Sequence, residues 1–163
     1  MEQVAISHGS KNTVLVLDGN HLRLAYSVYI IQLVNGNESY FYVGQTGDSH
    51  FITARSPLGR IGGHLQARNR SKQNQLYRYI AEVILKYPAR DKYSDYTIAE
   101  KAAINDFLSR STVNMYSYPV IDFDYHASKE EHQIQRQKVL EFEKEVINLF
   151  KEGKKHLINK SSP

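Results

Sequence analysis

The chain has 163 residues, of which 41% are hydrophobic, and a formal net charge of +4, so we expect a single domain over residues 1–163 with a core of its own. The absence of cysteine excludes disulfides, thiolate metal sites and cysteine nucleophiles. No apolar run approaches the roughly 18 residues of a membrane span, and no secretion signal opens the chain, so a cytoplasmic protein without a membrane partner is expected.

Strands are predicted in the first third of the chain. Residues 13–17 are typical of a strand that ends in a turn, and two apolar runs follow at 27–34 and 40–44. Between these runs lies Asn35-Gly36, a strong hairpin signal, because a type I′ turn needs positive φ at both central residues. We therefore expect a hairpin with Asn35 and Gly36 at the centre of its turn.

This register places Tyr29 directly opposite Tyr42 on one face of the predicted hairpin. Two phenols side by side on a sheet face form either a core pair or part of a site. Aromatic cross-strand pairs are common packing, so the pair alone favours a place in the core. The residues that follow in the sequence shift the balance toward a site.

Helices are predicted to fill most of the remaining chain. After a polar loop over residues 45–59, a first helix is expected near residues 60–64. A second helix has apolar residues at helical spacing from Leu76 to Tyr87 and stops before Pro88.

Two capping boxes mark the later helices. Thr97-x-x-Glu100 opens a third helix, and Ser128-x-x-Glu131 opens a long helix that continues to about Lys151. In each box the side chain of the first residue and that of the glutamate satisfy backbone N–H groups at the start of the helix.

The last predicted strand covers residues 113–123. Pro119 either breaks this strand or places it at an edge of a sheet, because proline has no N–H to donate to a neighbour. The expected architecture is α/β (α+β): a small, mainly antiparallel three-stranded sheet flanked by helices.

The central part of the chain is strongly basic. Residues 49–81 contain no Asp or Glu, so the acidic neighbours that would balance its positive charge are missing from this stretch. Such a stretch is typical of proteins that bind the phosphate backbone of nucleic acids, whereas a solvated helix face is the simpler alternative. The candidates for nucleic-acid binding are Arg55, Arg68, Arg70, Lys72 and Arg78.

Glu143 is predicted to lie on the buried side of the last helix. At about 100° per residue, with Val146 at 0°, Glu143 falls near 60°, inside an apolar arc that includes Phe142. Glu141 and Glu145 fall outside this arc. A buried carboxylate needs a partner, either a divalent cation or a basic side chain, and the spacing leaves both open. One carboxylate is enough for Mg²⁺, which keeps most of its water.

Arg60 and His64 lie one helical turn apart and share a face of the predicted first helix. The guanidinium of an arginine suits a phosphate oxygen and a histidine can relay a proton, although surface arginines and structural histidines are the commoner cases. Gly59, Gly62 and Gly63 around Arg60 suggest a close approach of the backbone to a ligand or to another helix.

Five short motifs together resemble those of the GIY-YIG nuclease family. In chain order they are Ser27-Val28-Tyr29, Tyr42-Val43-Gly44, Arg60, His64 and Glu143-x-x-Val146-Ile147. The resemblance covers a core of about residues 27–159, preceded by an extension over residues 1–26. Ser27 replaces the glycine that opens the first motif of the family, and the segment between Gly44 and Arg60 is longer than the family has, which makes Arg55 a substitute for Arg60.

The resemblance implies metal-dependent hydrolysis of phosphodiester bonds. The implied catalytic residues are Tyr29, Tyr42, Arg60, His64 and Glu143, with Asn159 as a further candidate. Tyr29 would help to activate the nucleophilic water and Tyr42 would position the site, while Glu143 would hold one Mg²⁺ or Mn²⁺ ion per active site. Beside a metal and Arg60, we expect the pKa of Tyr29 to fall below its ordinary value near 10.

The expected function is Mg²⁺-dependent cleavage of double-stranded DNA. A chain without an appended DNA-binding domain resembles a site-specific type II restriction endonuclease more than a homing or repair enzyme of the family, and such an enzyme commonly works as a homodimer. Two alternatives stay open: a structure-selective or non-specific nuclease of the same family, and a nucleic-acid-binding module without activity. The completeness of the catalytic set favours an enzyme.

Overall fold

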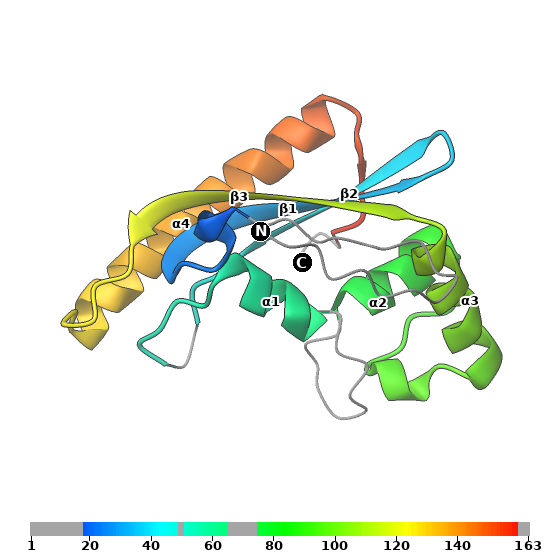
Figure 1. Ribbon diagram of the computed structural model, residues 1–163, viewed down its shortest axis with the longest axis horizontal. Helices are drawn as coiled ribbons and strands as arrows, with labels where there is room; N and C mark the ends of the chain where they lie inside the picture. Colours follow the sequence, from blue (N-terminus) through cyan, green and yellow to red (C-terminus); the bar gives the residue numbers. More distant parts are fainter. Residues whose placement is uncertain (1–17, 49–50, 65–74, 160–163) are drawn as a thin grey trace, which may run out of the picture.

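Figure 1 shows a computed structural model of the chain, which describes residues 18–48, 51–64 and 75–159. The strand predicted over residues 13–17 lies outside the described residues. The strands are β1 (Ala25–Asn35), β2 (Glu38–Gln45), β3 (Thr112–Asp122) and β4 (His156–Leu157). The helices are α1 (Pro57–His64), α2 (Gln75–Tyr79) with its π-helical continuation η2 (Ile80–Ile84), α3 (Ile98–Ser109) and α4 (Lys129–Glu152). Two 3₁₀ turns are η1 (Gly19–His21) and η3 (Tyr93–Asp95).

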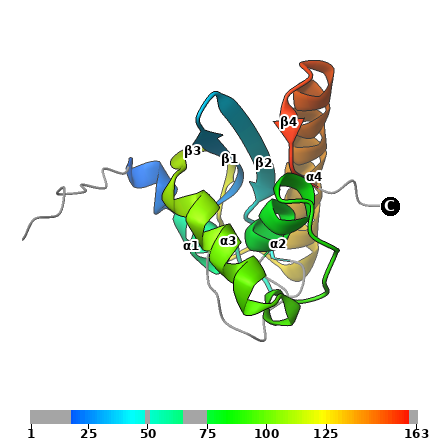
Figure 2. The same cartoon turned by 90° about the vertical axis from the view of Figure 1, so that its right-hand side faces the viewer.

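A mixed sheet with the strand order β3-β1-β2-β4 is the centre of the fold (Figures 1 and 2). β1 pairs antiparallel with β2 and β3, as expected, whereas the two-residue β4 pairs parallel with β2. The expected three-stranded sheet is therefore right for the long strands but omits β4, which forms as the chain returns from α4 along the outer edge of β2. β3 is the opposite edge of the sheet and pairs with β1 alone. An edge strand tolerates Pro119, which has no backbone N–H to donate.

The hairpin register differs from the prediction by two residues in all. Asn35 pairs with Glu38, so that Gly36 and Asn37 form the turn. Gly36 has a φ of +59°, whereas Asn37 is outside the positive-φ region, so the expected type I′ turn, which needs positive φ at both positions, does not form. Gly36 thus adopts its positive φ at the first central position of the turn, whereas the prediction placed it at the second.

The changed register keeps the two tyrosines on one face of the sheet. Tyr42 lies opposite Ile31, and Tyr29 lies opposite Gly44. Because side chains alternate between the faces with a period of two, Tyr29 and Ile31 point to the same side, and Tyr42 joins them. The tyrosines are therefore diagonal neighbours, and the direct pairing expected from the sequence is wrong.

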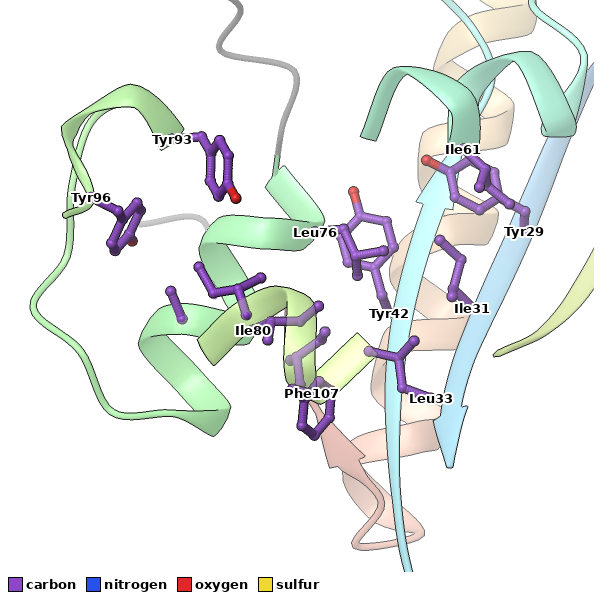
Figure 3. Packing of buried hydrophobic residues seen from close by; sticks show 13 residues of the cluster. Tyr29, Ile31, Leu33, Tyr42, Ile61, Leu76, Ile80, Tyr93, Tyr96 and Phe107 are labelled. Carbon is purple, nitrogen blue, oxygen red and sulfur yellow. The ribbon is translucent and has the colours of Figure 1, made fainter. Parts of the chain in front are cut away.

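Helices cover both faces of the sheet (Figures 1 and 2). On one face Val28 and Ile30 of β1 pack with Val139 of α4. On the other face Tyr29 and Ile31 of β1 pack against residues of α1, α2 and α3, as Figure 3 shows. β1 is buried on both sides, which explains its nearly continuous apolar sequence.

The predicted helix starts are confirmed at both capping boxes. Thr97 accepts a hydrogen bond from the backbone N–H of Glu100, and the carboxylate of Glu100 accepts one from the N–H of Thr97. Ser128 and Glu131 form the same reciprocal pair at the start of α4. α4 then continues to Glu152, close to its predicted end.

Two details of the helices differ from the prediction. The second helix, expected to reach Tyr87, ends at Ile84 after a π-helical turn. Phe142, expected inside the buried arc of α4, is 36% exposed, so the buried arc is narrower than the apolar pattern predicted. Among the helices that the structure describes, none is long and apolar enough to cross a membrane.

Candidate active site

The two motif tyrosines lie close together on neighbouring strands. The ring centroids of Tyr29 and Tyr42 are 6.2 Å apart, and both side chains are buried. Figure 3 shows them next to each other on β1 and β2, with Ile61 of α1 beside Tyr29. The two phenols therefore belong to one cluster, through diagonal pairing.

His64 contacts both tyrosines. Its Nε2 lies 2.7 Å from the hydroxyl oxygen of Tyr29, and its ring packs edge-on against Tyr42 with the centroids 5.2 Å apart. His64 is the last residue of α1 and is 2% exposed. A hydrogen bond between a phenol and an imidazole in a buried place provides a route for a proton.

Gly44 makes room for the phenol of Tyr29. A Cβ atom at position 44 would lie 2.5 Å from the Cζ atom of Tyr29, far inside van der Waals contact. The ring of Tyr29 thus lies over the backbone of β2 at the residue opposite it in the sheet. A glycine two residues after Tyr42 is required by this packing.

We expect Gly44→Ala to lower the free energy of unfolding by about 1–3 kcal/mol, because the new methyl group displaces the ring of Tyr29. Gly62→Ala in α1 is the matched control, since a Cβ there meets nothing within 4 Å. That open space also contradicts the close backbone approach expected at Gly62. Denaturant unfolding should show the control as stable as the wild type, or more so by about 0.5–1 kcal/mol. Equal stability of the two variants would contradict the position of Tyr29 over Gly44.

Glu143 reaches the tyrosine cluster from α4. Burial raises the pKa of its carboxyl to about 7, although Arg60, Arg136 and Lys144 each lower it. With the other described residues Glu143 forms no salt bridge, and the buried Nε of Arg60 has no hydrogen-bond partner. The carboxylate of Glu143 and the guanidinium of Arg60 interact electrostatically but form no salt bridge with each other. The carboxylate can therefore bind a cation, and the guanidinium can bind an anion.

The orientation of Glu143 agrees with the helical periodicity. Glu143 is partly buried, whereas Glu141 and Glu145 on the same helix are exposed. The prediction that only the middle glutamate faces inward is therefore confirmed.

Tyr29 is a protonated phenol at neutral pH. Burial raises its pKa to about 12; Arg60 and a hydrogen bond with Tyr42 lower it, and Glu143 raises it further. The pKa below 10 expected from the sequence is wrong, because the loss of solvation outweighs the attraction of Arg60. Tyr29 is thus suited to pass a proton on, and it does not rest as a phenolate.

A cavity of about 410 Å³ opens beside Glu143. Its other lining residues are Tyr42, Gln75, Tyr79, Leu140, Lys144, Ile147, Asn148, Lys151, Leu157 and Asn159. The hydroxyl of Tyr42 donates a hydrogen bond of 3.1 Å to Oε1 of Gln75, and the ring of Tyr79 packs against Tyr42. The sequence predicted none of the lysines of this wall, although Lys144 follows Glu143 directly and Lys151 lies two turns later.

Asn159 connects the end of the chain to the second tyrosine motif. Its Oδ1 accepts a hydrogen bond of 2.8 Å from the N–H of Val43, and its Nδ2 donates one of 2.7 Å to the carbonyl of Val43. The side-chain amide thus replaces a peptide group of a strand and continues the pairing of β4 with β2. Asn159 holds β2 next to Tyr42 and also lines the cavity.

The basic stretch has acidic partners at both of its ends. Arg55 forms a salt bridge of 3.2 Å with Asp48, and Arg78 lies 3.9 Å from Glu82. The expected lack of acidic neighbours is therefore wrong for these two arginines. Arg60, and not its substitute Arg55, is the arginine that acts on the tyrosine cluster. The other three candidates, Arg68, Arg70 and Lys72, lie outside the described residues.

Glu143 is the carboxylate that the cluster offers to a metal ion. Among the described residues, no group of three or more His, Asp or Glu side chains is placed to hold a metal ion. Mg²⁺ does not need one, since it binds through one or two carboxylates and keeps several waters. Glu143, buried enough to raise its pKa and without an ion-pair partner among the described residues, fits such an ion.

Comparison of the chain with protein-family models, curated proteins and solved structures finds no match. The resemblance to a nuclease family therefore rests on the motif residues themselves and on the way they come together.

Proposed function

We propose that this chain is a DNA endonuclease of the GIY-YIG type that depends on Mg²⁺, or on Mn²⁺ in its place. The observation that carries the proposal is the hydrogen bond between Tyr29 and His64, beside the unpaired Glu143 and the free Nε of Arg60. These groups come from β1, α1 and α4. Together they offer a proton route, a phosphate-binding cation and a metal-binding carboxylate, which are the parts that phosphodiester hydrolysis needs.

The protonated phenol of Tyr29 suggests a relay. Tyr29 accepts a proton from a water molecule at its hydroxyl oxygen while it donates its own proton to Nε2 of His64. The oxygen of that water attacks phosphorus, and the bond from phosphorus to the 3′ oxygen breaks. The 3′ oxygen leaves with the electron pair of that bond and takes up a proton from water to become a hydroxyl. Arg60 donates hydrogen bonds to the non-bridging oxygens of the phosphate and stabilises their growing charge. Glu143 would hold Mg²⁺, which when bound supplies Lewis-acid stabilisation of the phosphate and the leaving oxygen.

The raised pKa of Glu143 predicts a pH-dependent stability. The carboxyl is protonated up to about pH 7 in the folded chain but only up to about 4.5 in the unfolded chain. The contribution of this carboxyl to the free energy of unfolding is thus largest below pH 4.5 and is lost as the pH rises through 7. Relative to Glu143→Gln, the wild type should lose about 3 kcal/mol of unfolding free energy between these pH values. Denaturant unfolding of both proteins across this range measures the difference.

Mg²⁺ supplies the second half of this test. At pH 8 it should stabilise the wild type more than Glu143→Gln, because it binds the folded carboxylate and not the amide. Equal stabilisation of the two proteins would remove Glu143 from the metal site, whatever the enzyme does to DNA.

The finer proposal is a site-specific restriction endonuclease. One chain carries one Glu143, so a cut through both strands at one position needs two copies, and we propose a homodimer with double-stranded DNA as its substrate. Incubation with long duplex DNA and Mg²⁺, followed by sequencing of the new ends, tests this. A recurring sequence at the ends is expected. Scattered ends would indicate a non-specific or structure-selective nuclease, and intact DNA would leave only a binding module.

A further inference from the structure

Four of the five Lys and Arg side chains of α4 lie on one flank of the helix, and Lys138 lies on the other. At about 100° per residue, with Val146 at 0°, four cations fall between about 80° and 160°. They are Lys129, Arg136, Lys144 and Lys151. Three acids fall on the other side, between about −140° and −100°. They are Glu141, Glu145 and Glu152.

Along the axis of α4, Glu143 lies between the two pairs of cations, and at about 60° it lies at the edge of their flank. The four cations follow one another at intervals of seven, eight and seven residues, or about two helical turns each. Two of them, Lys129 and Arg136, precede Glu143, and the other two follow it. The carboxylate of the candidate site thus lies beside a row of positive side chains on α4, between the second and the third of them.

Two cavities open along this same flank, one that includes Glu143 in its wall and one that lies nearer the start of the helix. The first, of about 410 Å³, has Lys144 and Lys151 in its wall. The second, of about 270 Å³, has Lys129 and Arg136 in its wall. The four cations of the row therefore line two cavities, two cations in each. Figure 1 shows α4 as the long orange helix along the sheet.

The four cations are available for a ligand. None of them forms a salt bridge with another residue that the structure describes, in contrast to Arg55 and Arg78. The Nε of Arg136 is buried and has no hydrogen-bond partner. Unpaired cations in a row along one concave face are the arrangement that binds the phosphates of a nucleic-acid strand.

We propose that one strand of a DNA duplex runs along α4, with the phosphate to be cut at Glu143 and further phosphates bound on both sides of it. This inference rests on the proposed nuclease function and specifies its substrate. The row from Lys129 to Lys151 spans 22 residues. That is about 33 Å, a length of DNA backbone that carries several phosphates. The substrate is therefore an internal position of a long duplex, with DNA on both sides of the cut.

The test measures binding of a 30-base-pair DNA duplex in the absence of divalent metal, so that no cleavage takes place. Dissociation constants are determined from 50 to 300 mM salt for the wild type and for Lys129→Gln, Lys144→Gln, Lys151→Gln and the triple variant. Each single substitution should reduce the slope of log affinity against log salt by about 0.9, and the triple variant should reduce it by about 2.7. Lys138→Gln, an exposed lysine on the other flank of α4, is the matched control and should keep the wild-type slope.

The outcomes separate this inference from the proposed function. If the triple variant has the same salt slope as Lys138→Gln, the DNA strand does not run along α4, even if the wild type cleaves DNA. A wild type that binds with the predicted slopes but never cleaves supports the path and contradicts the nuclease. A reduction confined to Lys144 and Lys151 also overturns the proposal, since phosphates would then be bound on only one side of Glu143.

Discussion

Glu143→Gln should lower the rate of Mg²⁺-dependent DNA cleavage by about 10³-fold or more, while DNA binding persists. A bound metal contributes several kcal/mol to the transition state, and each 1.4 kcal/mol is worth about tenfold in rate. The amide keeps the shape of the side chain but binds a divalent cation poorly. Removal of a negative charge that faces phosphate should also leave affinity for DNA unchanged or higher.

Two exposed glutamates of the same helix are the controls. Glu141→Gln and Glu145→Gln make the same chemical change outside the cluster and should cut DNA at nearly the wild-type rate. Thermal unfolding must show that Glu143→Gln is folded, which the pKa of about 7 predicts it to be, since the neutral side chain suits the buried place. Cleavage by Glu143→Gln at the wild-type rate would reduce Glu143 to a structural residue.

Tyr29→Phe should lower cleavage by about 10²–10⁴-fold, the usual contribution of a group that transfers a proton in the rate-limiting step. Phenylalanine keeps the ring over Gly44 and removes only the hydroxyl that is bonded to His64. Single-turnover cleavage rates at saturating protein separate this loss from any change in DNA binding.

Tyr118→Phe is the matched control for the loss of a phenol. Tyr118 is 48% exposed on the edge strand β3, so its variant should cut DNA like the wild type. His64→Ala should resemble Tyr29→Phe, and the double variant should be little worse than either, because the two residues form one relay. Additive losses would contradict a shared proton route.

The hairpin shows how much a sequence can predict and where it stops. The two strands and the shared face of Tyr29 and Tyr42 follow from the apolar runs and from alternation. The register does not, because an Asn-Gly pair supports more than one two-residue turn, and the side chains that pack on the finished sheet decide between them. The register shifted by two residues, so that Tyr29 lies opposite Gly44 and not Tyr42, and a shift by an even number of residues preserves the face on which each side chain lies.

Long-range contacts were beyond the sequence. Helical periodicity predicted that Glu143 faces inward, and the capping boxes predicted the starts of α3 and α4. The parallel pairing of β4, the bond from Asn159 to Val43 and the bond from His64 to Tyr29 all join segments that are remote in the chain. No local pattern encodes them. The basic row of α4 was visible in the sequence as a spacing of seven and eight residues, but only the structure relates it to the cavities beside Glu143.

The most direct test of the account uses closed circular DNA duplex, which has no ends, with enough total sequence to contain every short recognition site. Incubation of the wild-type protein with this DNA and Mg²⁺ should convert it to nicked and linear forms with 5′-phosphate and 3′-hydroxyl ends, and a chelator should prevent the conversion. DNA that stays closed at every protein concentration, or that is cut equally well in the presence of the chelator, would contradict a metal-dependent endonuclease built on Tyr29, His64, Arg60 and Glu143.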